Sequence, residues 1–128
     1  MGVQFLSEGW TEAVTTALNS HEGFKGAVAD VDLTIQFTVS DAPDGDVHYH
    51  FQASGGNASV ELGEVEDSDV QIANDYETAV AITKGELNTE SAFFSGKLKA
   101  TGNLAKLMMH TNVISQWRAA NEGIEVDF

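Results

Sequence analysis

Two stretches in the first half of the chain alternate apolar and polar residues with the period of a β-strand. From Val31 to Val39 every second residue is apolar, and the same pattern returns from Val47 to Ala53. Because successive side chains of a strand point to opposite faces, each stretch predicts a strand with one apolar and one wet face. Residues 41–46 between them hold the chain's only Pro, so we expect a turn that pairs the two strands as a hairpin.

The alternation continues beyond this hairpin. A Gly-rich turn at residues 54–57 leads to a third predicted strand at residues 58–62. The acidic residues 64–69 then lead to a short fourth strand at residues 70–72. We expect these four strands to form a meander in which chain neighbours pair, and a last short strand returns at residues 97–101.

Polar residues that favour helix N-termini precede the predicted helices. The predicted N-caps are Ser7, Asp75, Asn88 or Thr89, and Asn103. After Ser7, apolar residues keep helical spacing to about Ser20. The helix after Asn103 is predicted to be long, and its broad apolar face, which includes Met108 and Met109, predicts substantial burial.

This order of elements is typical of the α+β class, with helices packed over one face of a mainly antiparallel sheet. The chain has 128 residues, the length of one domain, and we expect residues 1–128 to form a single one. Hydrophobic residues make up 42% of the sequence, which is enough to close one core.

The formal charge of -14 is unevenly distributed. Five of the six basic residues lie between positions 84 and 118, where only Glu86 and Glu90 are acidic, so this stretch carries +3 and the rest of the chain -17. The overall charge repels phosphate backbones, which argues against nucleic acid as a partner. The acid excess is typical of solubility, including solubility in a high-salt cell, and the basic stretch alternatively indicates approach to an anionic surface.

Nothing in the sequence favours an enzyme. The chain has no Cys, which excludes thiol catalysis and cysteine metal sites. Its acidic residues cluster in turns and on wet strand faces, where they are expected to be solvated rather than catalytic. Gly55-Gly56 lies between antiparallel strands with no helix after it, so it does not predict a phosphate loop. We therefore predict no catalytic residue and no cofactor.

The four His residues do not predict a metal site. His48 and His50 are two apart on a strand and share a face, as a two-His site requires, but no third ligand is assured and the face is the wet one. His21 and His110 fall near helix ends, where solvated or capping roles are usual. We therefore predict that the chain has no metal-binding site.

The stretch AFFSGKLKATGNLAKL, residues 92–107, resembles a segment of the sterol carrier protein type 2 family. Its features are an aromatic helix end, Ser-Gly-Lys-Leu, a strand, and a Gly-Asn step into an apolar helix. Gly96 and Gly102 allow sharp turns at the two ends of that strand. Residues 26–51 fit the family's opening hairpin, and residues 69–76 fit its fourth strand running into a helix. The resemblance covers nearly the whole chain.

This resemblance implies a five-stranded sheet and helices that enclose an apolar tunnel. The implied function is non-enzymatic intracellular binding and transfer of lipids: fatty acids, fatty acyl-CoA, sterol-like or other apolar ligands. The residues expected to line the tunnel are Phe93, Phe94, Leu98, Leu104, Leu107, Met108, Val113, Tyr49, Phe51 and Trp117. Each of these also fits a plain core.

The expected partners are a lipid or other apolar small molecule and, transiently, a membrane or an enzyme. An anionic headgroup or membrane would meet the basic residues Lys97, Lys99, Lys106 and Arg118. The alternative function is an interaction or dimerisation module that presents an apolar substrate to a partner enzyme. The chain ends Val126-Asp127-Phe128 rather than in a peroxisomal Ser-Lys-Leu address, which predicts a cytoplasmic location.

Overall fold

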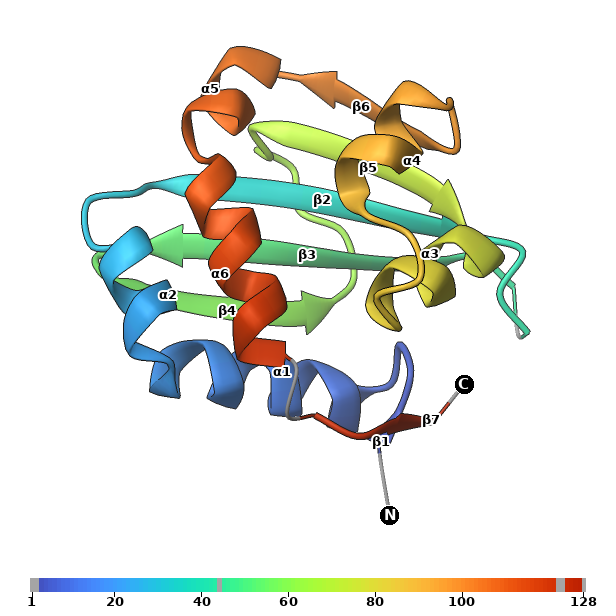
Figure 1. Cartoon of the computed structure of the whole chain (residues 1–128), viewed down its shortest axis with the longest axis horizontal. Coiled ribbons are helices and arrows are strands. Elements are labelled where there is room, and N and C mark those ends of the chain that lie inside the picture. Colours follow the sequence, from blue (N-terminus) through green and yellow to red (C-terminus); the bar gives the residue numbers. More distant parts are fainter. Residues whose placement is uncertain (1–2, 44, 122–123, 128) are drawn as a thin grey trace.

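A mixed sheet with helices on one face is the frame of the molecule (Figure 1). The computed structural model describes residues 3–43, 45–121 and 124–127, without the side chains of Thr89, Glu90, Thr111 and Ile114. In chain order the elements are β1 (Val3–Gln4), α1 (Glu8–Ser20), α2 (Glu22–Ala27), β2 (Leu33–Ser40), β3 (Val47–Ser54), β4 (Asn57–Leu62), β5 (Val70–Asp75), α3 (Tyr76–Thr83), α4 (Thr89–Phe94), β6 (Leu98–Gly102), α5 (Leu104–Met109), α6 (Thr111–Asn121) and β7 (Val126–Asp127). Within the described ranges, no helix is both long and apolar enough to span a bilayer.

The strand order of the main sheet is β4-β3-β2-β5-β6. All neighbouring strands are antiparallel except β2 and β5, which are parallel, so the predicted α+β class with a mainly antiparallel, five-stranded sheet is confirmed. The predicted four-strand meander was wrong, because β5 pairs with β2 instead of β4. Val70 and Ile72 thereby lie beside Ile35 and Phe37, and the apolar residues of both strands share the covered face.

Helix α1 packs along β4 and protects its edge. Trp10, Val14 and Leu18 are buried on the inner side of this helix. From the same helix, the Thr15 hydroxyl accepts a hydrogen bond from the Val60 amide at 2.9 Å. The Asn19 side chain accepts a hydrogen bond from the Ala58 amide at 3.0 Å and donates one to the Ala58 carbonyl at 2.8 Å. At Ala58 and Val60 the outer edge of β4 thus has its backbone groups satisfied by a helix rather than left open for pairing.

The predicted N-caps are confirmed at all four helix starts, with Asn88 rather than Thr89 as the cap of α4. The side-chain acceptors and amide donors are Ser7 with Trp10 at 3.2 Å, Asp75 with Thr78 at 2.8 Å, Asn88 with Ser91 at 2.7 Å, and Asn103 with Lys106 at 3.1 Å. Hydrogen bonds from Thr78 hold the pKa of Asp75 below its ordinary value.

Two helical features differ from the predictions. Helix α2 was missed because Gly23 and Gly26 weaken the helical pattern. Its formation is explained by His21, whose Nδ1 accepts the Phe24 amide at 3.0 Å, and by the complete burial of Phe24. The predicted long terminal helix is divided at His110 into α5 and α6.

The division at His110 changes the surroundings of α5. Val113 of α6 is 2% exposed, whereas Met108 and Met109 of α5 are 72% and 78% exposed. The substantial burial predicted for this apolar face was therefore wrong at α5. The apolar periodicity runs through both helices, but after the turn at His110 only part of the apolar face of α5, Leu104 and Leu107, packs against the core.

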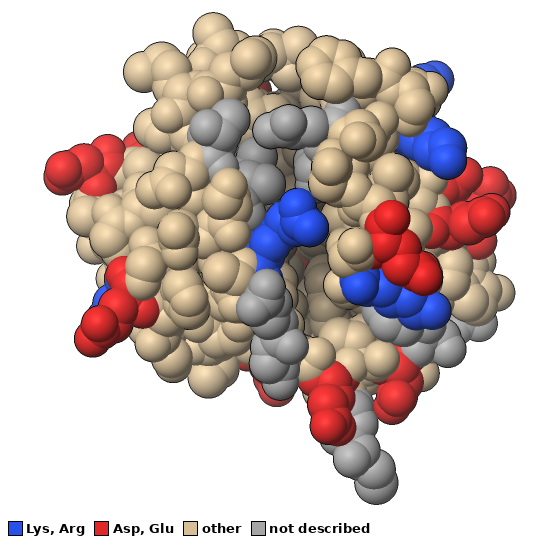
Figure 2. Space-filling view, viewed as in Figure 1, with Lys and Arg blue, Asp and Glu red and all other residues tan. Residues whose placement is uncertain are grey.

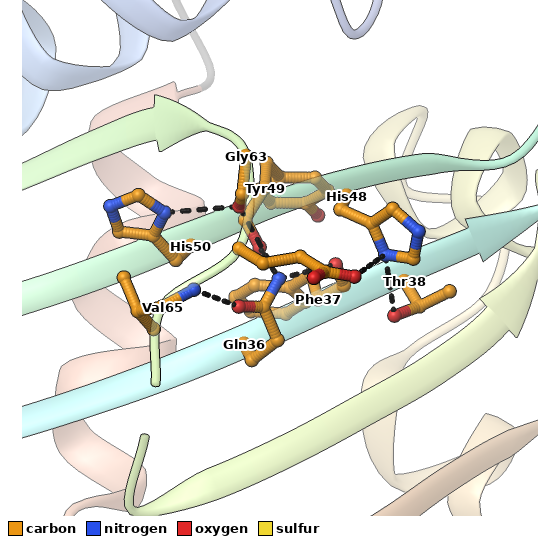
Figure 3. A network of polar contacts seen from close by, with 9 residues as sticks. Gln36, Phe37, Thr38, His48, Tyr49, His50, Gly63 and Val65 are labelled. Carbon is orange, nitrogen blue, oxygen red and sulfur yellow. Dashed lines mark hydrogen bonds and ion pairs between the residues drawn. The ribbon is translucent and has the colours of Figure 1, made fainter. Parts of the chain in front are cut away.

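Residues 63–69 connect β4 to β5 across the outer face of the sheet, where a polar network holds their first part (Figure 3). Gln36 accepts the Val65 amide at 2.7 Å and donates to the Tyr49 carbonyl at 3.1 Å. The His50 ring bonds the Gly63 carbonyl at 3.1 Å, and its burial there differs from the solvated position expected for the wet face. These polar residues therefore fix the crossover.

Asp69 holds the end of the same connection. Its backbone amide donates to the Thr34 carbonyl at 2.8 Å, and its Oδ2 accepts the Thr34 amide at 2.9 Å. Its carbonyl accepts the Asn103 amide at 2.7 Å, and Lys106 Nζ lies 3.2 Å from its carboxylate. The hydrogen bond from Thr34, with a smaller contribution from Lys106, holds the pKa of Asp69 below its ordinary value.

The two ends of the described chain meet in a separate parallel pair, β1 and β7. Val3 pairs with Val126, and Gln4 pairs with Asp127 (Figure 1). The segment after β1 buries Phe5 against Trp10, with ring centroids 5.1 Å apart. Residues near both ends of the sequence therefore reach the space between the helices and the sheet.

Candidate functional site

A cavity of about 500 Å³ lies between the apolar face of the sheet and the helices. This volume falls within the roughly 300–1,000 Å³ typical of pockets for small molecules. The apolar lining residues are Phe5, Trp10, Val14, Ile35, Phe37, Tyr49, Ile72, Ala79, Ile82, Leu98, Trp117, Ile124 and Val126. The cavity wall is therefore formed by residues from both ends of the described chain and from most of the elements between them.

Aromatic rings in contact form one side of the cavity. Trp10 meets Tyr49 edge to face at 5.2 Å, and Tyr49 stacks on Phe37 at 4.6 Å. Trp117 of α6 then approaches Phe37 edge to face at 5.8 Å. Each such pair contributes about 0.5–1.5 kcal/mol beyond its buried area, so this wall is held by the fold before any ligand enters. Burial raises the pKa of the Tyr49 phenol, which keeps the ring neutral.

Polar and charged groups enter the lining at the ends of α3 and α6. Thr83, Lys84 and Gly85 follow the apolar part of α3, and Arg118 and Asn121 come from α6. The side chains of Lys84 and Arg118 are exposed. Figure 2 shows Lys and Arg side chains beside the hollow in this face. The site thus combines an apolar interior with two cations near its opening.

Three of the residues predicted to bind ligand, Tyr49, Leu98 and Trp117, line this cavity. Phe51 is fully buried behind the wall and stacks on Trp117 at 4.7 Å. The remaining predicted residues do not line it: Val113 is buried in the core, Leu104 and Leu107 are partly buried against it, and Phe93, Phe94 and Met108 are 44%, 83% and 72% exposed.

Most of the cavity wall was not singled out by sequence reasoning. Ile35 and Phe37 were placed on the apolar face of a strand, but alternation gives the same signal for a core residue as for a cavity wall. Ala79 and Ile82 lie on α3, which was predicted only as a helix that begins after the cap Asp75. No motif in the sequence marked Phe5 or Val126 as part of the cavity wall.

The four predicted basic residues have different surroundings. Arg118 lines the cavity, whereas Lys106 forms an ion pair with Asp69 at 3.2 Å. Lys97, which directly precedes β6, and Lys99 within that strand are exposed. No group of three His, Cys, Asp or Glu residues within the described chain is arranged to hold a metal ion.

Comparison of the chain with known protein families identifies one that matches it. The profile of the SCP-2 sterol transfer family matches residues 14–115. The chain belongs to the SCP-2 sterol transfer family. The match includes β2 to β6, with the segment of residues 92–107 on which the resemblance was based. A search of curated proteins found no match.

Solved structures share this fold. A crystal structure of sterol carrier protein 2 is 22% identical, with a TM-score of 0.80, and the alignment covers 95% of this chain and 100% of that one. The hypothetical protein TT1886 of Thermus thermophilus is 22% identical, with a TM-score of 0.80 and coverage of 98% and 93%. A ubiquinone synthesis protein, UbiJ-SCP2, is 15% identical, with a TM-score of 0.63 and coverage of 88% of both chains.

Proposed function

We propose that the protein binds a single lipid in the cavity between sheet and helices and transfers it without catalysing a reaction. The observation that carries the proposal is the cavity of about 500 Å³, whose wall is aromatic and aliphatic and whose opening holds Lys84 and Arg118. Membership of a family described by sterol transfer supports the same function. We place this activity in the cytoplasm.

The expected driving force is the removal of apolar surface from water. It amounts to about 25 cal/mol per Å² of apolar surface, or about 0.8 kcal/mol per methylene. An interior without charged groups sets few directional requirements, so we expect broad selectivity among acyl chains and sterol-like ligands. The Arg118 cation at the opening favours ligands with a carboxylate or phosphate group, such as fatty acids and acyl-CoA.

Native mass spectrometry of the purified protein tests this function. We expect a co-purified lipid at near one-to-one stoichiometry, which denaturing extraction releases for identification. If the protein is empty and also takes up no fluorescent fatty acid, the carrier function is wrong.

Arg118→Gln is expected to weaken the binding of a fatty acid about five-fold, because an exposed ion pair contributes about 1 kcal/mol. The Kd of a fatty alcohol of the same chain length should stay unchanged. Isothermal titration with both ligands measures the difference. Lys25→Gln is the matched control, since Lys25 is an exposed cation of α2 outside the cavity lining. Equal losses for the alcohol and the acid would contradict a headgroup role for Arg118.

A second function is a module that presents an apolar substrate to a partner enzyme. The likeness in fold to UbiJ-SCP2, a ubiquinone synthesis protein, favours this alternative. If the protein is such a module, we expect the isolated protein to have an empty cavity and to take up no lipid. The mass spectrometry experiment therefore distinguishes the two functions.

A further inference from the structure

One polar side chain interrupts the apolar inner face of β5. The residues of this strand that face the helices are Val70, Ile72 and Asn74, because they lie two apart, and Val70 and Ile72 are buried. Asn74 pairs with Val39 of β2 on one side and with Leu98 of β6 on the other, and both neighbours are buried. The Asn74 amide therefore lies in an otherwise apolar part of the sheet.

The part of the chain that the structure describes leaves this amide without a hydrogen bond. The backbone carbonyl of Asn74 accepts the Ser40 hydroxyl at 3.4 Å, but no described group bonds the side chain. The next residue, Asp75, caps α3. Asn74 is half-buried and lines the cavity of about 500 Å³. Its donor and acceptor are therefore available to a molecule in the cavity.

An amide in an apolar wall is unfavourable unless its hydrogen bonds are made. In an empty cavity water can make them. A ligand that displaces this water loses affinity unless one of its own groups replaces the lost hydrogen bonds. The cavity therefore favours a ligand that carries a polar group at Asn74 and disfavours plain hydrocarbon there.

The polar group that suits this position is uncharged. Both neighbours of Asn74 in the sheet, Val39 and Leu98, are apolar and buried, and apolar surroundings disfavour a charge much more strongly than a hydroxyl. The Arg118 guanidinium, in contrast, suits a carboxylate. An amide both donates and accepts hydrogen bonds, and so does a hydroxyl, so the two groups can pair in either direction.

We propose that Asn74 binds a hydroxyl group of the ligand and makes the cavity selective for hydroxylated apolar molecules, such as long-chain alcohols, over hydrocarbons of the same shape. This inference rests on the proposed lipid binding and adds one directional contact to it. Asn121, the other amide of the lining, has its Oδ1 buried with no hydrogen-bond partner in the described chain. A ligand reaches that atom only if the Asn121 side chain rotates, so Asn74 is the better placed of the two.

Displacement of a fluorescent fatty acid from the full chain tests this contact, with a long-chain alcohol and the alkane of the same length as competitors. The measured quantity is the ratio of the alkane Kd to the alcohol Kd, in which effects of cavity shape cancel. Asn74→Leu nearly keeps the side-chain volume and removes both hydrogen-bonding groups. It should lower the ratio about ten-fold, because the hydroxyl is then buried without a partner. The Kd of a fatty acid should not rise, since its carboxylate meets Arg118.

Thr83→Val is the matched control. Thr83 also lines the cavity, but its hydroxyl already donates to the Ala79 carbonyl at 2.8 Å, so the ratio should stay at the wild-type value. Circular dichroism verifies that the variants are folded. Asn74→Leu should be no less stable than the wild type, because it places an apolar side chain on an apolar face. Asn74→Ala, which also removes the amide, should lower the ratio in the same direction.

Two outcomes would overturn the inference alone. One is an unchanged ratio in Asn74→Leu and Asn74→Ala, which would mean that this residue does not distinguish a hydroxyl from hydrocarbon. The other is a ratio lowered by Asn121→Leu but not by Asn74→Leu, which would assign the hydroxyl to α6. Both outcomes leave lipid uptake intact. A wild-type protein that takes up none of these ligands would instead contradict the carrier function, and this inference with it.

Discussion

Ala79→Phe is expected to weaken the binding of a long-chain fatty acid about 100-fold. Ala79 is 5% exposed, lies on α3 and lines the cavity. A phenyl ring added there fills space that the ligand would occupy. If it displaces about four methylenes at about 0.8 kcal/mol each, the lost binding free energy is about 3 kcal/mol. Fluorescent fatty-acid displacement measures the change in Kd.

A graded series supplies the control for this prediction. Ala79→Val adds less volume than Ala79→Phe and should cause a smaller loss, and a shorter fatty acid should lose less affinity than a longer one in both variants. Because the cavity accepts the new side chain, the thermal midpoint should stay close to that of the wild type. An unchanged Kd for Ala79→Phe, with the fold intact, would show that the ligand lies elsewhere.

Gly102→Ala is expected to lower the free energy of unfolding by about 3–5 kcal/mol. Gly102 ends β6 with φ +94°, and a Cβ there would lie 2.6 Å from the Asp69 carbonyl oxygen. That oxygen already accepts the Asn103 amide at 2.7 Å. The substitution therefore forces apart the pairing of β5 with β6 and the start of α5. Urea denaturation measures the loss.

Gly96→Ala is the matched variant for this experiment. Gly96 has φ +80°, and a Cβ there would meet no atom within 4 Å. It should lose only the cost of a left-handed backbone in a residue with a side chain, about 1–2 kcal/mol. Equal losses at the two positions would show that the close approach of Asp69 to Gly102 does not matter.

The features that sequence reasoning predicted depend on local chemistry. Alternation in β2 and β3 fixes which residues face the core, and the caps Ser7, Asp75 and Asn103 each bond an amide three residues away. The position of β5 depends instead on a parallel partner far along the chain, which alternation does not specify. The break at His110 interrupts no apolar period, so the pattern gave no sign that α5 and α6 separate.

The same limit applies to the candidate site. Tyr49, Leu98 and Trp117 were predicted and line the cavity, but Phe93, Phe94 and Met108 carry an equally apolar signal and lie in solvent. Hydrophobicity measures the tendency of a side chain to leave water, and it does not distinguish burial in a core, contact with a ligand or insertion in a membrane. Only the arrangement of elements in space separates these cases.

The parallel pairing of β1 with β7 also governs when the cavity can exist during synthesis. Phe5 and Val126 both line it, and Val3 pairs with Val126, so one wall needs residues from both ends of the described chain. A ribosome delivers β1 before the main sheet and β7 after it. The hairpin of β2 and β3 can pair while translation continues, but the complete cavity wall forms only once β7 has emerged. A nascent chain that stops short of β7 therefore lacks the part of the wall that Val126 supplies.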